Sequence, residues 1–450
     1  MLHKFIINNT RVVLDVHSGA VHRVDRLTWD VLEDYRNIAR DGLLEKLARR
    51  YPGQEVEEAL AEVDELVEAG LLFSPDPLGG SYTPPAHNIV KALCLHLAHD
   101  CNLACRYCFA GQGKFGGPAG LMSLETGKAA LDFLMNSSGG RRHVEVDFFG
   151  GEPLLNKRVL YGLVEYGNKL AGERDKEIKF TLTTNGLLLD EETGDFLNRH
   201  DMSVVLSLDG RPAVHDTMRP FPGGGGSYDI ISRKIINFLE SRDYRNYYVR
   251  GTYTANNTDF SRDVLHLAGL GLREISVEPV VAPPEEEYAL REEHIPGLSR
   301  EYALLADMVL ERARAGDPIN FFHFNIDLEG GPCLPKRLSG CGAGSEYLAV
   351  DPEGGLYPCH QFVGQEEYVM GDVYGGLVNK ELPARFAGAH VYSKEGCAEC
   401  WAKFFCSGGC HAGARAYSGT ILKPNPLGCR LMKMRLECAL YLKVAMAGQQ

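Results

Sequence analysis

The stretch CNLACRYCFA, residues 101–110, decides how the rest of the chain is interpreted. It places Cys101, Cys105 and Cys108 at C-x3-C-x2-C spacing in one short loop. A structural zinc site closes its coordination with four ligands, whereas three thiolates can hold three corners of a 4Fe–4S cube and leave one iron open. A zinc knuckle or a set of structural thiols is the alternative. Because the loop directly follows an apolar strand pattern, it favours the open cluster.

The sequence around this loop alternates strand and helix patterns from about residue 90 to residue 290. Helical patterns such as SLETGKAALDFLMNS, with Ser123 as N-cap, separate the apolar segments. Six β/α units predict a parallel sheet curled into a partial barrel, with the chemistry at the C-terminal ends of its strands. The expected strands are residues 89–98, 143–149, 178–184, 203–209, 247–253 and 273–280.

Length and charge limit the class of protein. The 450 residues exceed one ordinary core and predict two or three domains. The formal charge of −13 argues against nucleic-acid and membrane-surface partners. No apolar run approaches the roughly 20 residues of a membrane helix, and the N-terminus MLHKFIINNT lacks the pattern of a signal peptide. The expected location is the cytoplasm.

The thirteen cysteines are unevenly placed, with four in residues 94–108 and nine in residues 333–438. A reducing compartment does not favour a disulfide framework, and clustered cytosolic cysteines indicate metal or cluster ligands. Glycine, cysteine and short turns dominate the C-terminal part. We therefore expect little apolar core there and a fold held together by metals.

Residues 1 to about 74 read as a separate module. An alternating pattern in FIINNTRVVLDVHSGAVHRV predicts a short strand pair, and three short helical patterns follow. This order suggests a winged helix. Because its last helix is strongly acidic, we expect it to bind a protein or peptide rather than DNA. A Pro/Gly-rich linker, SPDPLGGSYTPP, occupies residues 74–85.

The cysteine loop, with the aromatic Tyr107 before its last cysteine, resembles the signature of radical S-adenosylmethionine (SAM) enzymes. In that family SAM chelates the open iron through its amino and carboxylate groups. An electron from the reduced cluster splits the sulfonium, and the resulting 5′-deoxyadenosyl radical abstracts a substrate hydrogen. The resemblance implies a 4Fe–4S cluster on Cys101, Cys105 and Cys108, with SAM on the fourth iron.

The expected strand ends carry further matches to that family. Residues 150–153 resemble its GGEP motif, which lies against the methionine amino group, and glycines let the backbone approach a ligand closely. TTNG (183–186) and SLDG (207–210) end the next two strands, where related enzymes face the SAM ribose and carboxylate; ordinary turn residues are the alternative. Arg219 is either a bidentate donor to the SAM carboxylate or a surface arginine. The residues that the resemblance assigns to SAM are Tyr107, Gly150, Gly151, Glu152, Pro153, Thr184, Asn185, Ser207, Asp209 and Arg219.

The C-terminal cysteines form a second pattern: C-x12-G-x4-C, then C-x2-C-x5-C-x3-C, then a last cysteine after eighteen residues. This resembles the SPASM domain of peptide-modifying radical SAM enzymes, which holds two auxiliary 4Fe–4S clusters with interleaved ligands. Zinc is the alternative metal for C-x2-C. The resemblance assigns Cys341, Cys359 and Cys410 to the first auxiliary cluster, and Cys397, Cys400, Cys406 and Cys429 to the second.

Cys333 leaves an alternative open. It can supply the fourth thiolate of the first auxiliary cluster, or this cluster can keep an open iron for a substrate thiolate, which would hold a peptide cysteine deprotonated and positioned. We favour the open or exchangeable site. Cys94 and Cys438 are expected to be buried thiols.

The substrate follows from a closer resemblance. Sulfatase-maturing enzymes share both cluster patterns, but they carry an aspartate as general base where this chain has His360. FHFNIDLEGGPC, CGAGSEYLAV, PEGGLYPCHQFVG, CWAKFFCSGGCHA and the N-terminal module resemble the maturases of small peptides with six cysteines in forty-five residues. That family implies a thioether between a cysteine sulfur and a carbon of another residue, often Thr, in a precursor peptide. His360 and Tyr357 are placed suggestively, but no general base is assigned.

The expected fold class is α/β, with a partial (β/α)6 radical SAM barrel, an N-terminal winged-helix-like recognition domain and a C-terminal SPASM domain. The implied partners are SAM, three 4Fe–4S clusters, a Cys-rich precursor peptide and a reducing donor such as a flavodoxin or ferredoxin. Other radical peptide oxidations, such as formylglycine formation or carbon–carbon crosslinking, and a non-enzymatic electron carrier or zinc scaffold are the alternatives. The expected parts are residues 1–80 for leader recognition, 88–296 for the barrel, 297–325 for a connecting helix and 326–450 for the SPASM domain.

Overall fold

The computed structural model describes residues 1–85, 89–328 and 334–447. The chain begins with an antiparallel sheet in the order β1-β2-β3. The sequence predicted a strand pair, and the structure adds a third strand after the turn at residues 16–20. Three helices follow the sheet, as predicted. The elements are β1 (Leu2–Ile7), β2 (Thr10–Asp15), β3 (Val21–Val24), α1 (Arg26–Asp34), α2 (Arg40–Leu47) and α3 (Gly53–Glu68).

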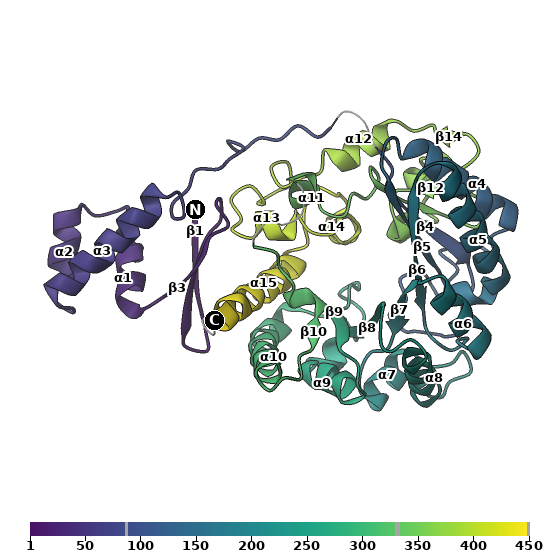
Figure 1. Cartoon of the computed structure of the whole chain (residues 1–450), viewed down its shortest axis with the longest axis horizontal. Helices are drawn as coiled ribbons and strands as arrows, with labels where there is room; N and C mark the ends of the chain where they lie inside the picture. Colours follow the sequence, from purple (N-terminus) through teal and green to yellow (C-terminus); the bar gives the residue numbers. More distant parts are fainter. Residues whose placement is uncertain (86–88, 329–333, 448–450) are drawn as a thin grey trace.

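Both faces of this small sheet are covered. Val13 of β2 packs with the buried side chains of α1, α2 and α3. Its neighbours Val12 and Leu14 point to the opposite face, as the alternation of a strand requires, and belong to the main core. That face lies on the C-terminal helix α15 (Pro426–Ala447), which contacts all three strands. The N-terminal sheet therefore contributes to the main core with one face and to the module's own core with the other, and Figure 1 shows the sheet beside α15.

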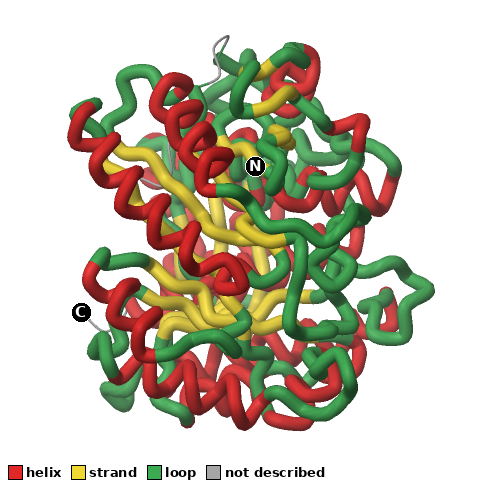
Figure 2. The backbone as a smooth tube through the Cα atoms, turned by 90° about the vertical axis from the view of Figure 1, so that its right-hand side faces the viewer, coloured by secondary structure: helices red, strands yellow, loops and turns green. Residues whose placement is uncertain are grey.

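The barrel has the six predicted parallel strands. Figures 1 and 2 show the helices on the outer side of the curved sheet. The strands are β4 (Ala92–Ala98), β5 (His143–Gly150), β6 (Glu177–Thr184), β7 (Ser203–Ser207), β8 (Tyr247–Tyr253) and β9 (Glu274–Pro279). The helices that follow them are α4 (Leu124–Ser137), α5 (Lys157–Glu173), α6 (Glu191–Arg199), α7 (Pro212–Met218), α8 (Tyr228–Glu240), α9 (Ser261–Gly269) and α10 (Ile295–Arg314).

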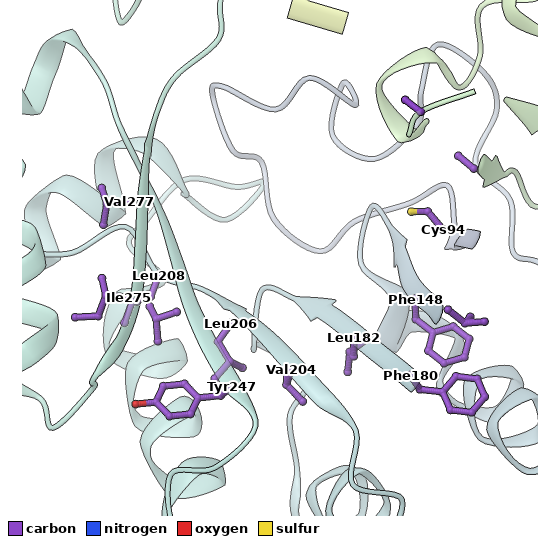
Figure 3. Close-up of a cluster of buried hydrophobic side chains, with 14 of the residues drawn as sticks. Cys94, Phe148, Phe180, Leu182, Val204, Leu206, Leu208, Tyr247, Ile275 and Val277 are labelled. Carbon is purple, nitrogen blue, oxygen red and sulfur yellow. The ribbon is translucent and has the colours of Figure 1, made fainter. Parts of the chain in front are cut away.

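Alternating burial along the strands builds the core between sheet and helices. In β5, Val146 and Phe148 are fully buried, whereas the intervening residues are partly exposed. The Phe148 ring stacks on Phe180 of β6 with centroids 5.6 Å apart, and Figure 3 shows the two rings side by side. Gly167 of α5 lies so close that an added Cβ would be 2.8 Å from Phe180, which places this layer beneath the helix.

The C-terminal part continues the barrel sheet instead of forming a separate unit. Within the described residues the sheet order is β10-β9-β8-β7-β6-β5-β4-β11-β12-β13-β14. The expectation of little apolar core here was wrong, because Leu348, Val350 and Phe386 are buried in the same core as the barrel. Pairing of β11 with β4, the first strand of the barrel, supplies the apolar partner that the C-terminal sequence lacks by itself.

The remaining elements are short. The strands are β10 (Asn320–Phe321), β11 (Tyr347–Val350), β12 (Gly355–Tyr357), β13 (Gly371–Asp372) and β14 (Gly376–Leu377). The helices are α11 (Leu334–Ser339), α12 (Glu381–Ala387), α13 (Lys403–Cys406) and α14 (His411–Ser418), with 3-10 turns η1 (Pro153–Asn156), η2 (Ala255–Asn257), η3 (Glu292–His294), η4 (Phe322–Phe324), η5 (His360–Phe362) and η6 (Glu366–Tyr368). Among the described residues, no helix combines the length and apolar character needed to cross a membrane.

Candidate functional site

The C-x3-C-x2-C loop leaves the C-terminal end of β4, as predicted. Its backbone is hydrogen-bonded to the end of α7 and the residues that follow it, where Ala104 N donates to Pro220 O and Arg106 N to Met218 O, both at 2.9 Å. Burial raises the pKa of Cys101 to about 12 and that of Cys105 to about 11. The neighbouring thiols of Cys105 and Cys108 add to the shift at Cys101, and the thiol of Cys108 adds to the shift at Cys105. This grouping fits a metal cluster, which binds thiolates and releases their protons.

The end of β5 presses against this loop. Gly150 has φ +125°, and a Cβ there would lie 2.4 Å from Ala98 O; a Cβ on Gly151 would lie 2.1 Å from Asp100 O. Glu152 N then donates to Asp100 O at 2.9 Å. The sequence predicted that these glycines let the backbone approach a ligand closely. In the structure they bring two backbone segments together, and so fix the cysteine loop relative to β5.

Glu152 connects the ends of β5 and β6. Its carboxylate is buried and accepts hydrogen bonds from Thr184 Oγ1 (2.8 Å), Asn185 N (2.9 Å) and Leu154 N (3.0 Å). Burial raises the pKa of Glu152 to about 7, although the three hydrogen bonds oppose this effect. A carboxyl poised near neutrality, without a cation, is suited to accept a hydrogen bond from an ammonium group.

Asn185 links this carboxyl to the cysteine loop. Its side-chain amide donates to Asn102 Oδ1 at 2.8 Å and lies 3.8 Å from Cys101 Sγ. The structure thus brings together Glu152, Thr184, Asn185 and the cysteine loop, as the sequence predicted. Pro153 begins η1 directly behind Glu152, and Ser207 ends β7 half-buried.

Asp209 holds Tyr107 and Arg219 in place. Its buried carboxylate accepts from Tyr107 OH at 2.6 Å, from Arg219 Nε at 3.1 Å and from Thr252 N at 3.0 Å. The Arg219 guanidinium also lies 5.4 Å from the Tyr107 ring centre. Arg219 is therefore not a surface arginine. Asp209 orients it beside Cys105, and contact of either residue with SAM stays a prediction.

The C-terminal cysteines form two groups in space. Burial is the main cause that raises the pKa of Cys359, and the thiols of Cys410 and Cys341 add to it. We call these three residues the first auxiliary thiol group. Burial also raises the pKa values of Cys397 and Cys406, each to about 11, with contributions from their neighbours. The second auxiliary thiol group consists of Cys397, Cys400, Cys406 and Cys429.

These groups have the membership that the SPASM resemblance implies, and seven thiols in two sets fit iron–sulfur clusters by their donor chemistry. Within the described ranges, no three His, Cys, Asp or Glu side chains are arranged to hold a single metal ion. Cys94 and Cys438 are buried, as predicted. Cys333 lies outside the described residues, so its role stays a prediction.

Aromatic side chains join the cysteine loop to the first auxiliary thiol group. The ring of His360, the neighbour of Cys359, contacts those of Phe109 and Phe149 in tilted arrangements, with ring centroids 5.6 and 5.0 Å apart. Phe109 follows Cys108 directly. Burial and the charge of Arg250 lower the pKa of His360 to about 4, so its ring is neutral. Its Nδ1 is buried and has no hydrogen-bond partner among the residues that the structure describes.

Sequence reasoning missed two features of the site. Phe109 is one, although an aromatic residue directly after the last loop cysteine was visible in the sequence. Lys394 is the other: it is buried among the auxiliary thiols, three positions before Cys397. A lysine one turn before a C-x2-C motif is the signal that was available for it.

Comparisons with known proteins agree with this site. Residues 91–228 match a family model described as a 4Fe–4S single cluster domain. The mycofactocin maturase MftC of Mycobacterium ulcerans is 28% identical over 76% of this chain and 88% of its own length. The serine-type anaerobic sulfatase-maturating enzyme of Klebsiella aerogenes is 25% identical over 73% of this chain and 80% of its own. The chain is a homologue of the radical SAM/SPASM maturases.

Solved structures bear out the fold of this radical SAM/SPASM homologue. The enzyme anSMEcpe with bound AdoMet superposes with a TM-score of 0.68 over 80% of this chain and 95% of that chain, at 20% identity. Streptococcus suis SuiB bound to its precursor peptide SuiA gives a TM-score of 0.54 over 95% of this chain and 98% of that chain, at 14% identity. The predicted fold class is thereby confirmed.

Proposed function

We propose that this radical SAM/SPASM homologue forms cysteine thioether crosslinks in a ribosomally made, Cys-rich precursor peptide. The observation that carries the proposal is the contact between the rings of His360 and Phe109, which are tilted to one another with centroids 5.6 Å apart. One ring neighbours Cys108 of the SAM-type loop, and the other neighbours Cys359 of the first auxiliary thiol group. A site that generates a carbon radical and a site that can hold a sulfur would therefore be neighbours, as C–S bond formation requires.

Three 4Fe–4S clusters fit the three sets of thiols. Cys101, Cys105 and Cys108 would hold the SAM-binding cluster. The two auxiliary thiol groups would hold the other two clusters, and Cys333 is the alternative to an open iron in the first auxiliary cluster. When bound, the SAM-binding cluster and SAM supply a 5′-deoxyadenosyl radical that takes a hydrogen atom from a substrate carbon. Glu152 would accept a hydrogen bond from the SAM amino group, with Tyr107, Gly150, Gly151, Pro153, Thr184, Asn185, Ser207, Asp209 and Arg219 around it.

Each crosslink removes two hydrogens from the peptide. One leaves carbon as a hydrogen atom; the other leaves sulfur as a proton, and one electron must then be accepted. A substrate group that reached the buried Nδ1 of the neutral His360 would meet a nitrogen without a hydrogen-bond partner among the described residues, and Phe109 and Phe149 pack against the same ring.

The precursor peptide is assigned to the N-terminal sheet. The faces of that sheet are covered by helices, so its edge strands β1 and β3 are what it offers to a peptide strand. SuiB, whose fold spans nearly the whole chain, was solved with its precursor peptide. An external donor such as a flavodoxin or ferredoxin would supply the electron for SAM cleavage.

The test is co-expression of the chain with the Cys-rich open reading frame expected beside its gene. Intact-mass measurement should show the loss of two hydrogens per crosslink, and the crosslinked thiols should resist alkylation. A peptide of unchanged mass would refute the thioether assignment. Formation of 5′-deoxyadenosine from SAM and dithionite tests the radical SAM assignment separately.

The homology to sulfatase-maturating enzymes supports one other reaction, the oxidation of a peptide residue to formylglycine. His360 in place of the aspartate base argues against it. Alkylation distinguishes the reactions, since oxidation of a serine to formylglycine or a carbon–carbon crosslink leaves all thiols free, whereas a thioether consumes one thiol for each bond.

A further inference from the structure

Lys394 is a buried cation between the two auxiliary thiol groups. The residue is only 3% exposed. Its ammonium donates to Gly408 O at 2.9 Å and to Gly409 O at 3.4 Å. In the part of the chain that the structure describes, it forms no ion pair with a carboxylate. A buried ammonium without a carboxylate is costly, so its neighbours must supply negative charge.

The two glycines lie where the chain passes from one thiol group to the other. Cys406 of the second group precedes them, and Cys410 of the first group follows them. Both glycines have positive φ, +81° and +70°, and a Cβ on Gly408 would lie 3.0 Å from Lys394 Cδ. The lysine side chain thus runs along this crossing segment, and its ammonium fixes the two carbonyls that separate the groups.

The charge of Lys394 reaches both thiol groups. Burial lowers the pKa of the ammonium, while Cys397 and Cys406 of one group, and Cys410 and Cys341 of the other, oppose this effect. In a buried site the attraction between a cation and a negative charge is far stronger than in water. Thiolates ligating two clusters would supply the negative charge that this ammonium lacks.

We propose that Lys394 is a positioning residue whose charge stabilises the one-electron-reduced form of both auxiliary clusters. The inference rests on the proposed function, because it needs the clusters in place. Reduction adds one electron, and hence one negative charge, to a cluster; the electron comes from dithionite in the experiment below and from the peptide after C–S bond formation in the proposed reaction. A fixed cation nearby favours the uptake of an electron by either auxiliary cluster.

The test is a potentiometric titration of the reconstituted full chain with dithionite, followed by electron paramagnetic resonance. In Lys394→Met, we expect the ratio of reduced to oxidised auxiliary cluster at a fixed potential to fall about tenfold, a shift of about 59 mV for a one-electron couple. Lys394→Arg keeps the charge and should keep the wild-type potentials. Lys423→Met, which neutralises an exposed lysine paired with Glu395, is the matched control and should shift neither potential.

Iron content separates the outcomes. Lys394→Met with three-cluster iron content and unchanged potentials would overturn the inference. If Lys394→Met loses iron, Lys394→Gln takes its place, since glutamine keeps a donor for Gly408 O without the charge. Loss of iron in both neutral variants would overturn the inference as well, because Lys394 would then be a folding residue. A wild-type chain that binds only the SAM-type cluster would instead refute the proposed function.

Discussion

Replacing Asp76 by asparagine is expected to loosen the N-terminal module from the C-terminal domain. Asp76 lies in the linker, and its carboxylate accepts hydrogen bonds from Lys403 Nζ and Tyr392 OH, each at 2.8 Å. The side chain of Lys403 is only 2% exposed and that of Asp76 17%, so the ion pair is largely shielded from water. It closes the linker onto the segment that carries the second auxiliary thiol group.

The magnitude follows from the pKa of Asp76. Burial by itself raises this pKa, but hydrogen bonds from Lys403, the Leu78 amide and Tyr392 outweigh burial and lower it from 3.8 to about 2. A carboxyl with a depressed pKa stabilises the folded state above about pH 4 and loses this contribution as the pH falls toward 2. At about 1.36 kcal/mol per pKa unit, the charge stabilises the closed linker by roughly 2 kcal/mol at neutral pH.

Hydrogen exchange measures this free energy locally. The amides of residues 74–80 and 392–403 should exchange roughly 30-fold faster in Asp76→Asn, because opening becomes easier by that free energy. Asp175→Asn removes a carboxylate from an exposed turn and should change nothing. Unaltered exchange of the linker amides in Asp76→Asn would contradict the reasoning.

Three further predictions concern the cluster sites. Gly151→Ala should abolish SAM cleavage, measured as 5′-deoxyadenosine, since its Cβ would lie 2.1 Å from Asp100 O and displace the cysteine loop; retained cleavage would contradict this. SAM affinity, measured by calorimetry, should rise as the pH passes through about 7, because the ionised Glu152 carboxylate accepts a hydrogen bond from the SAM amino group more strongly than the protonated carboxyl does. Glu152→Gln should bind SAM weakly and without that rise. Cys105→Ala should lose SAM cleavage but keep the iron of the auxiliary clusters, whereas Cys400→Ala should lose iron from the C-terminal domain. Iron analysis distinguishes the two variants, and equal losses of iron would refute the assignment of the ligands.

The barrel could be predicted because its information is local. The strands β5 to β9 are indicated by apolar alternation and β4 by a continuous apolar run, and a loop that follows β4 must lie at the C-terminal edge of a parallel sheet. The two auxiliary thiol groups were also predictable in their membership. There the prediction came from the spacing of the cysteines and a family resemblance, not from any physical rule that joins residues as distant as Cys341 and Cys410.

Features made by contacts between distant segments could not be predicted. Helix α15 is an example: residues 438–442 are buried in succession, since the helix is enclosed by α10, η4 and the N-terminal sheet, and no single apolar stripe marks it. The stacking of His3 on Trp401, with ring centroids 3.7 Å apart, joins residues from the two ends of the chain. Neither residue lies in a local sequence pattern that predicts contact with the other.

These contacts bear on how peptide recognition can be tested. Removing residues 1–74 would uncover α15, because Phe5, Val12 and Leu14 are buried against the main core. Such a deletion would expose an apolar surface and confuse loss of recognition with loss of stability. A substitution on a sheet edge avoids this problem.

Arg23→Pro on β3 is that substitution. The hydrogen bond from Asp15 N to Ala20 O fixes which pairs of β2 and β3 are hydrogen-bonded. Because such pairs recur every second residue in an antiparallel ladder, His22 is hydrogen-bonded to β2, and the N–H of Arg23 points away from β2 toward the free edge. Proline at position 23 removes one donor from the free edge, whereas His22→Pro breaks the ladder and is the control for damage to the sheet. We expect Arg23→Pro to cleave SAM with dithionite like the wild type and to modify the co-expressed peptide several-fold more slowly by mass spectrometry. Full peptide modification by Arg23→Pro would show that the peptide does not extend β3, because an added strand cannot pair with an edge that lacks its donor.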